Sequence, residues 1–229
     1  MQCPECGHHH IQKNGHRRGK QNHICVDCGR QFIDSYSPRG YSDWTKRLCL
    51  RMYVNGLGFR GIERVIGVAH TTVIDWLAQV GECLPDAYDP ETIPQVGELD
   101  ELETFVGRKR DKVWIWTVVD HFLPGILGRA VGDHSAETFR PVWQAIAGWQ
   151  CFFWVSDGNP VYPSFIPDGD QIVSKTYMTR VEGENTRLRH YLARLHRKTL
   201  CYSKSVDMLK HSIRLLIHYL KFDEVPIPA

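Results

Sequence analysis

Two pairs of cysteines near the start of the chain limit what its first part can fold into. Cys3 and Cys6 form one C-x-x-C pair, Cys25 and Cys28 form the second, and 18 residues separate the two pairs. This separation is typical of a closed, tetrahedral zinc site made of four thiolates. We therefore expect a zinc ribbon over residues 1–35, in which these four cysteines bind a structural Zn²⁺ ion.

Two other interpretations of the cysteines are chance pairing and a redox-active dithiol, and neither explains two pairs at a zinc-like separation. The three histidines at positions 8–10 are further possible ligands, but we expect a run of this kind in a loop to face solvent. The segment between the pairs is basic and suits contact with phosphate groups. Its candidate DNA-binding residues are Arg17, Arg18 and Lys20.

The distribution of charge is more informative than the formal net charge of +2. Lys and Arg outnumber Asp and Glu by 11 to 6 in residues 1–80 and by 10 to 3 in residues 180–221, whereas residues 81–179 carry 7 against 15. Two basic ends around an acidic middle suit a nucleic-acid binder whose active centre is built from carboxylates. An ordinary solvated surface is the alternative interpretation.

The sequence contains no apolar run near the ~20 residues of a membrane span, and its first ten residues lack the apolar core of a signal peptide. We therefore expect a cytoplasmic protein with no membrane partner, associated with the nucleoid when it is bound to DNA. In a reducing compartment, paired cysteines indicate metal binding rather than disulfides. The unpaired cysteines are expected in the core: Cys49, Cys83, Cys151 and Cys201.

Three helices are expected over residues 41–83, after a turn-rich stretch at residues 37–43. Asp43 is the expected N-cap of the first helix, in which apolar residues recur at helical spacing. The next two helices, over residues 59–66 and 71–80, are joined by a short turn, which is the helix-turn-helix pattern. Another kind of three-helix bundle is the alternative. The residues expected to pack the two helices together are Ile62, Val65, Val73, Ile74 and Leu77. Those expected to face the major groove are His70, Thr71, Thr72 and Asp75.

Residues 84–95 are rich in proline and acidic side chains and are expected to link the helices to a third domain over residues 96–222. Periodicity in this domain predicts three strands, an amphipathic helix, a short buried strand, a further strand and then helices. This order is that of a ribonuclease H-like α/β fold, within a multidomain α/β protein. The five strands are expected within residues 96–107, 111–122, 125–132, 151–157 and 171–176.

Acidic residues fall at informative positions in this order. Asp157 ends the fourth strand, where an Asp-Gly turn is the ordinary explanation. In a ribonuclease H-like fold the first and fourth strands are neighbours, so Asp100 in the first strand and Asp157 would come together. A later helix offers a third carboxylate, either Glu182 or Glu184. Glu184 shares its helix face with Leu188, Tyr191 and Leu195 and is the weaker candidate.

The chemistry of phosphodiester cleavage and strand transfer explains why three acids would gather. Charge develops on the attacking and leaving oxygens, and two Mg²⁺ (or Mn²⁺) ions stabilise it. Mg²⁺ prefers carboxylate oxygens, so Asp100, Asp157 and a glutamate are a sensible ligand set. Asn185 and Arg189 share a helix face with Glu182. The basic residues expected to hold DNA beside the site are Arg180, Arg187, Arg189, Arg194, Arg197 and Lys198.

These motifs resemble transposases of the insertion-sequence-one (IS-one) family, nearly from end to end. The resemblance is carried by "CPECG", "ICVDCGRQF", "GFRGIERVIGVAHTTVIDWL", "VSDGNPVY" and "RVEGENTRLRHYLARLHRKTLCYSKS". The family's DDE pattern places 24 residues between the second aspartate and the glutamate, and a basic residue seven positions after the glutamate. Glu182 satisfies both, with Arg189 as the basic residue, whereas Glu184 is followed at that distance by Tyr191.

The resemblance implies a transposase that binds the terminal inverted repeats of its element. It implies Mg²⁺-dependent DNA cleavage and strand transfer at Asp100, Asp157 and Glu182. It also implies double-stranded DNA as the partner, both element ends and target, and at least a homodimer on DNA. A non-catalytic DNA-binding regulator and a nuclease that hydrolyses without joining are the alternatives.

Overall fold

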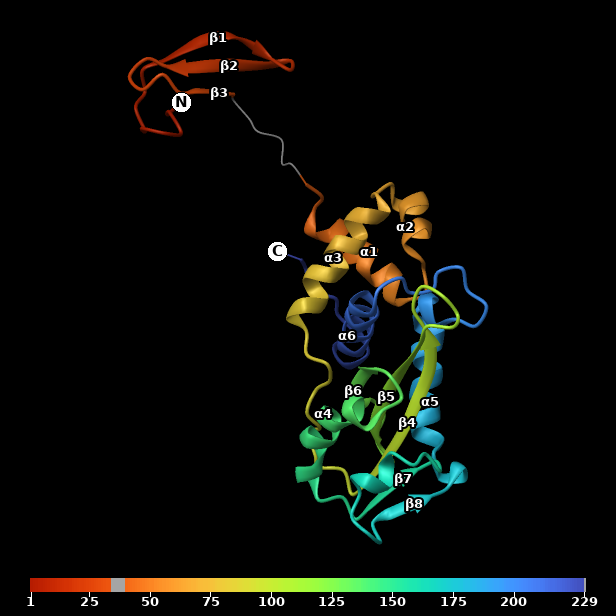
Figure 1. The fold of residues 1–229 in the computed structure, drawn as a ribbon. Helices are drawn as coiled ribbons and strands as arrows, with labels where there is room; N and C mark the ends of the chain where they lie inside the picture. The colour runs from red at the N-terminus through yellow and green to blue at the C-terminus, as the bar shows by residue number, and fades with distance from the viewer. Residues whose placement is uncertain (34–39, 229) are drawn as a thin grey trace. The chain divides into compact units, whose positions relative to one another are not determined.

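The computed structural model describes residues 1–33 and 40–228, which form two compact units, Met1–Ser42 and Asp43–Ala229 (Figure 1). The end of the expected zinc ribbon, at residues 34–35, lies outside the described residues. So does the start of the expected turn-rich stretch, at residues 37–39. The domain limits proposed from the sequence stay predictions.

The first unit is built on a small antiparallel sheet. Its strands are β1 (Ile11–Arg17), β2 (Lys20–Cys25) and β3 (Gln31–Ile33), in the order β1-β2-β3. Few apolar side chains are buried here, among them Phe32, whose ring stacks on His23. A module with so small a core depends on other interactions for its stability.

The second unit begins with three helices, α1 (Asp43–Val54), α2 (Phe59–Ile66) and α3 (His70–Cys83). The predicted limits of α2 are confirmed, and α3 starts one residue earlier and ends three residues later than predicted. Gly67 ends α2 at φ 80°, and its backbone N–H donates to the carbonyl oxygen of Glu63. Glycine suits this left-handed position because it has no Cβ.

The prediction of apolar packing between α2 and α3 is confirmed for three of its five residues, and Ile74 is only half-buried. Ile62, Val73 and Leu77 are fully buried, but Val65 is 65% exposed. The prediction for Val65 is wrong because Ile66, four residues after Ile62, takes the inner face of this short helix.

The rest of the second unit is built on a five-stranded sheet. Its order is β6-β5-β4-β7-β8, with β4, β5 and β6 antiparallel and β7 and β8 parallel to β4. The predicted α/β class is therefore confirmed, and the first and fourth strands of this sheet are neighbours. The strands are β4 (Val96–Phe105), β5 (Lys112–Asp120), β6 (Ile126–Gly132), β7 (Phe153–Ser156) and β8 (Gln171–Val173).

Helices cover both faces of this sheet. Alternate side chains of each strand point to opposite faces, so Leu99 packs with the residues of α4, whereas Leu102 packs with those of α5 and α6. The helices are α4 (Ala136–Ile146), α5 (Thr179–Tyr191) and α6 (Val206–Phe222). Short 3-10 helices are η1 (Ala147–Trp149), η2 (Tyr162–Ser164), η3 (Lys175–Tyr177) and η4 (Ala193–Leu195).

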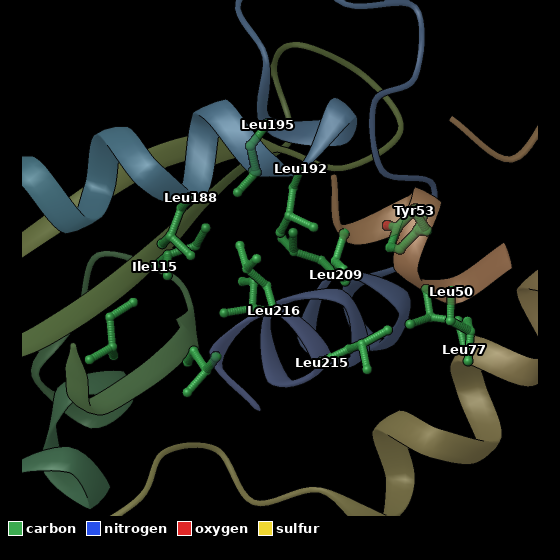
Figure 2. Packing of buried hydrophobic residues seen from close by; sticks show 14 of the residues in the cluster. Leu50, Tyr53, Leu77, Ile115, Leu188, Leu192, Leu195, Leu209, Leu215 and Leu216 are labelled. Atoms are coloured by element: carbon green, nitrogen blue, oxygen red, sulfur yellow. The ribbon is translucent and has the colours of Figure 1, made fainter. Parts of the chain in front are cut away.

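Helix α6 lies at the centre of the larger hydrophobic core (Figure 2). It contacts the sheet and α5, and it also packs against α1 and α3. Gly81 of α3 allows a close approach, since a Cβ there would lie 2.4 Å from the Cβ of His211. The helix-turn-helix segment and the sheet therefore share one core.

The expected linker over residues 84–95 is tied to this body. Asp86 receives hydrogen bonds from the guanidinium groups of Arg129 and Arg214, and the Nε of Arg129 donates to its carbonyl oxygen at 2.9 Å. Partial burial opposes ionisation, but these arginines hold the pKa of Asp86 below its ordinary value. The side chain of Arg129 is 1% exposed, and Asp86 supplies the opposite charge beside its buried guanidinium.

The unpaired cysteines divide into two groups. Cys49 and Cys151 are buried, as expected, but Cys83 and Cys201 are exposed. The core prediction for this second pair is wrong: Cys83 is the last residue of α3, and Cys201 lies in the segment between η4 and α6. Within residues 1–33 and 40–228, no helix is long and apolar enough to cross a membrane.

Candidate active site

The four cysteines of the first unit converge on one point. Their sulfur atoms all lie within 4.8 Å of one another. Each pair ends in a similar turn, because Gly7 and Gly29, both at φ 73°, donate a backbone hydrogen bond to the first cysteine of their pair. Burial opposes ionisation of Cys3, but the backbone N–H groups of Cys6 and Glu5 lower its pKa to about 6. The arrangement is compatible with structural zinc.

The neighbouring histidines point elsewhere. The Nδ1 atoms of His8 and His10 lie 3.5 and 3.8 Å from the carboxylate of Asp27, and both side chains are about two-thirds exposed. Among the described residues, the group of possible metal ligands that lie this close together consists of the four cysteines, and no histidine belongs to it.

Asp100 and Asp157 occupy neighbouring strands of the second unit. Asp100 lies in β4, and Asp157 directly follows β7, which pairs with β4 in parallel. Burial raises the pKa of Asp100 to about 6, and the negative charges of Glu101 and Asp157 act in the same direction. The two predicted aspartates thus lie close enough to interact electrostatically.

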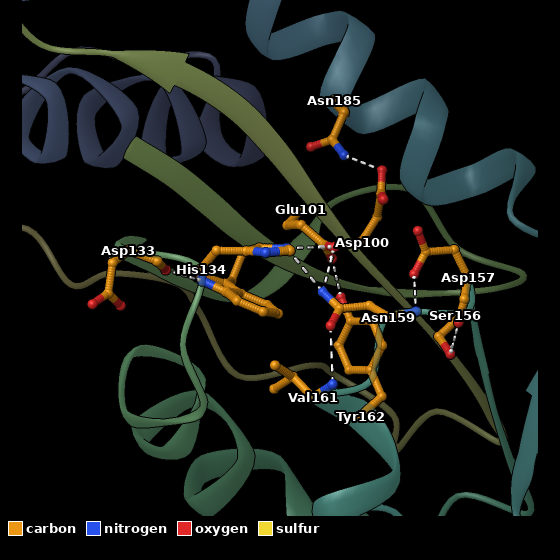
Figure 3. Close-up of polar contacts among 11 residues, drawn as sticks. Asp100, Glu101, Asp133, His134, Ser156, Asp157, Asn159, Val161, Tyr162 and Asn185 are labelled. Carbon is orange, nitrogen blue, oxygen red and sulfur yellow. Dashed lines mark hydrogen bonds and ion pairs between the residues drawn. The ribbon is translucent and has the colours of Figure 1, made fainter. Parts of the chain in front are cut away.

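Asn185 of α5 contacts the first of these acids (Figure 3). Its Nδ2 donates to the Oδ2 of Asp100 at 2.7 Å, and its Oδ1 accepts a hydrogen bond from Thr117 at 3.2 Å. Both Asn185 and Thr117 are buried. This pair of bonds turns one face of α5 toward the strand that carries Asp100.

The two candidate glutamates occupy different surroundings on α5. Glu182 is exposed in the first turn, three residues before Asn185, and therefore lies on the face that meets Asp100. Glu184 is buried, and its Oε1 accepts hydrogen bonds from the backbone N–H of Gly125 and from Arg187. Neither contact of Glu184 involves Asp100, Asp157 or Asn185. Within the described chain, the three acids are not gathered as closely as the cysteines.

A hydrogen-bonded network on the opposite face of β4 escaped the sequence prediction. Glu101 accepts from the hydroxyl of Tyr162 and from the Nδ2 of Asn159, each at 2.5 Å, and its Oε1 lies 3.0 Å from the Nε2 of His134 (Figure 3). Asn159 in turn donates its backbone N–H to the Oδ1 of Asp157 at 2.9 Å. The network therefore fixes the loop that follows Asp157.

Comparison with known proteins supports a family assignment for the part of the chain that holds these residues. The family model described as IS1 transposase matches residues 95–223, more than half of the chain. The chain belongs to the IS1 transposase family. The matched range runs from the start of β4 to the end of α6 and includes the three predicted acids, while the cysteines and the helix-turn-helix segment lie before it.

Individual IS1 proteins show the same similarity. The chain is 32% identical over 123 residues to the insertion element IS1 protein InsB of Shigella flexneri and to that of Shigella sonnei, a stretch of 54% of this chain and 92% of each relative. It is equally similar to the insertion element IS1 9 protein InsB of Escherichia coli K12, of which 72% is covered. Membership of this family supports a role in transposition.

The basic residues predicted to hold DNA in this IS1-family chain differ in their exposure and in their contacts. Burial lowers the pKa of Arg189, as does the neighbouring charge of Arg197, while the charge of Asp100 opposes both. Arg189 therefore lies near Asp100. Lys198 is exposed, whereas Arg187 pairs with Glu184 at 2.8 Å.

Two other predicted arginines make internal contacts. Arg180 donates from a terminal nitrogen to the carbonyl oxygen of Phe122 at 3.3 Å. Arg194 is buried, donates to the hydroxyl of Tyr53 at 2.6 Å, and lies over the rings of Tyr53 and Phe59. Since its guanidinium is occupied inside the protein, we leave Arg194 out of the proposed DNA-binding surface.

The predicted DNA-contacting residues of this IS1-family chain lie in the first turns of α3 and in the β1–β2 hairpin. Thr71 and Asp75 are exposed, Thr72 is half-buried, and the Nδ1 of His70 lies 2.8 Å from Glu63 of α2. In the first unit, Arg17 and Arg18 are exposed at the hairpin turn and Lys20 is half-buried. Their role in recognition stays a prediction.

Proposed function

We propose that this chain is a DDE-type transposase that cuts and joins DNA at Asp100, Asp157 and Glu182. In this proposal, residues 96–222 carry the chemistry, and residues 84–95 link them to DNA-binding modules at residues 1–35 and 41–83. The modules would recognise the terminal inverted repeats of the element.

One observation carries the proposal: the hydrogen bond between Asn185 and Asp100. It directs a helix face toward a pair of neighbouring strands that already bring together two aspartates. Glu182 is three residues before Asn185 and so shares its helix face, whereas the side chain of Glu184 is bonded to Gly125 and Arg187; both points support the choice of Glu182.

The donor set fits a hard divalent cation. Asp100 is a partly buried carboxylate within the field of Asp157, and carboxylate oxygens are the ligands that Mg²⁺ prefers. Asp100, Asp157 and Glu182 would hold Mg²⁺ or Mn²⁺. When bound, such ions stabilise the charge that develops on the attacking and leaving oxygens of a phosphodiester.

The other residues would orient the substrate. The charge of Arg189 lies near that of Asp100, and Lys198 is exposed, so both side chains would be available to hold the phosphate backbone. The nucleophile would be water for cleavage and the freed 3′-hydroxyl for joining. No covalent bond to the protein is needed.

Recognition and assembly complete the proposal. The zinc-binding module and α3 would contact double-stranded DNA at the element ends, with the exposed residues Thr71, Asp75, Arg17 and Arg18 among the contacts. Joining two ends requires at least a dimer on DNA. Light scattering on the protein–DNA complex should give the mass of two or more chains, and a complex with one chain would contradict this.

The test of the proposed function is a joining assay on DNA. Purified protein is incubated with Mg²⁺ and a labelled fragment that carries the element's own terminal repeat, with Asp157→Ala in parallel. We expect joined products from the wild type only, with equal binding of the fragment by both proteins. Binding without cleavage or joining by the wild type would reject the catalytic assignment and favour a DNA-binding regulator.

A further inference from the structure

Glu98 of β4 is a fully buried acid that the proposed chemistry does not use. Its side chain is 0% exposed, and both of its oxygens have partners. Oε2 accepts a hydrogen bond from the backbone N–H of Val181 at 2.7 Å, and Oε1 lies 2.5 Å from the Nδ1 of His121. Val181 directly precedes Glu182 in the sequence, so this acid is bonded to the residue next to the proposed third carboxylate.

The start of α5 lacks a cap of its own. Met178 precedes the helix and its side chain makes no capping hydrogen bond. The first N–H groups of a helix have no partner within the helix, and a carboxylate placed there is favourable for both hydrogen bonding and charge. Glu98 takes one of these N–H groups, at the third residue of α5, from a strand that lies 83 residues earlier in the chain. It does for α5 what a local N-cap residue usually does.

Two bonds now join α5 to β4, and their spacings match. Glu98 and Asp100 are two residues apart on one face of the strand, a rise of about 6.6 Å. Their partners Val181 and Asn185 are four residues apart on the helix, a rise of about 6 Å. Helix and strand can therefore be joined at both points without distortion, and Glu182 lies between the two points.

His121 restricts Glu98 to this position. It follows the last residue of β5, and its backbone N–H donates to the carbonyl oxygen of Val96 at 3.0 Å. The ring is thus held beside the start of β4, where its Nδ1 contacts the Oε1 atom of Glu98. A carboxylate with both oxygens bonded cannot rotate away from the helix.

We propose that Glu98 is a positioning residue that sets the location of Glu182 relative to Asp100, by bonding the first turn of α5 to β4. This inference rests on the proposed function, because it assigns a purpose to the location of Glu182. Glu98 itself would touch neither DNA nor the metal ions.

Hydrogen exchange tests the structural step without any catalysis. In the intact protein, Glu98→Ala should speed amide exchange in the first turn of α5, while Glu98→Gln, whose amide oxygen can still accept from Val181, should keep it near the wild-type rate. Glu98→Asp keeps the charge on a side chain too short for both partners, and should also exchange faster if Glu98→Ala does not fold. Glu103→Ala, an exposed acid of the same strand, is the control. Unchanged exchange in Glu98→Ala or Glu98→Asp would overturn the proposal.

Binding of Mn²⁺ alone tests the positioning step. Relative to wild type, Glu98→Ala or Glu98→Asp should weaken Mn²⁺ binding by about 10-fold or more, since residues that orient metal ligands typically have effects of this size. Glu98→Gln and Glu103→Ala should bind nearly as wild type. Faster exchange with unchanged Mn²⁺ affinity would show that Glu98 only stabilises the helix, and would overturn the proposal.

The reference variant Asp157→Ala separates the two possible failures. If it weakens Mn²⁺ binding and the Glu98 variants do not, the metal site stands and the role of Glu98 is wrong. If neither Asp157→Ala nor the Glu98 variants change the affinity, the metal site of the proposed function is wrong, and the positioning role falls with it.

Discussion

At the scale of single residues, Asn185 is the side chain on which the candidate site depends most. It bonds Asp100 on one side and Thr117 on the other, and all three groups are shielded from water to a large extent. A buried polar group that loses its partner costs free energy, and loss of the Asn185 side chain would leave the carboxylate of Asp100 without this donor. Asn185 therefore fixes the orientation of the first acid of the proposed set.

Replacing Asn185 with alanine should lower DNA joining by about 10- to 100-fold, the usual effect of removing a group that orients a metal ligand. The fragment carrying the terminal repeat should still bind. Thr186→Ala, an exposed neighbour on the same helix, is the matched control and should join DNA normally. Wild-type rates for Asn185→Ala in a gel-based joining assay would remove this residue from the site.

The two glutamates of α5 give a paired prediction. Glu182→Gln should abolish cleavage and joining with little change in thermal stability, because Glu182 is exposed. Glu184→Gln should instead lower stability by about 1–3 kcal/mol, since a buried charged hydrogen bond to Arg187 is weakened. Thermal melts and the joining assay on both variants decide between them, and loss of joining in Glu184→Gln alone would reverse our assignment.

At the scale of elements, the sequence predicted the strands and helices well because each has a clear period. The strand with Asp100 and the strand ending before Asp157 were placed correctly, and their adjacency followed from the order of elements. The network around Glu101 was not predictable, because its partners come from the loops after β6 and β7 and have no regular spacing. In the sequence, the only indication of this network was that two further acids follow closely after Asp100.

The segment over residues 84–95 shows the same limit. Its prolines and acids indicated a solvated linker, but Asp86 pairs with arginines of β6 and α6, 43 and 128 residues away. No local pattern can reveal contacts at such separations. That Arg129, the partner of Asp86, is buried could be learned only from the structure.

Asp86→Asn should therefore destabilise the second unit by roughly 1–3 kcal/mol at neutral pH, at the lower end because half of the carboxylate is exposed and screened by solvent. The folded-state pKa of Asp86 lies below its ordinary value, so its contribution is complete above about pH 5 and is lost as the pH falls below about 4. Urea unfolding of wild type and variant across this range should show the two curves converging in acid.

Asp89→Asn is the control for this experiment. Asp89 is an exposed acid of the same segment, and its contact with Lys221 uses its backbone oxygen rather than its carboxylate. Its stability should follow that of the wild type at every pH. A constant difference between wild type and Asp86→Asn down to pH 3 would contradict the ion-pair explanation.

At the scale of the whole molecule, the two units depend on different forces. The second has a large apolar core that includes α6, while the first buries few apolar side chains and gathers four cysteines instead. In a module of this kind the free energy of metal binding is also free energy of folding. The two units should therefore respond differently to removal of metal.

Chelation of zinc should unfold residues 1–33 and leave the second unit folded. Hydrogen exchange by peptide would show loss of protection in β1, β2 and β3 but not in the second unit, and Cys25→Ser should reproduce this without a chelator. Cys201→Ser, at an exposed cysteine of the second unit, should change neither. Retained protection of the first unit in a strong chelator would exclude a structural metal.

The central place of α6 also bears on how the protein is made. On the ribosome, α6 emerges after all the other helices and strands described here, yet α1 and α3 bury their inner faces against it. Until synthesis has passed Phe222, the helix-turn-helix segment lacks this partner, and apolar surface left exposed in a nascent chain is open to chaperones and proteases. Under the proposed function, a nascent chain would complete its DNA-binding segment only once α6 has been made, so recognition of the element would come with the proposed catalytic domain.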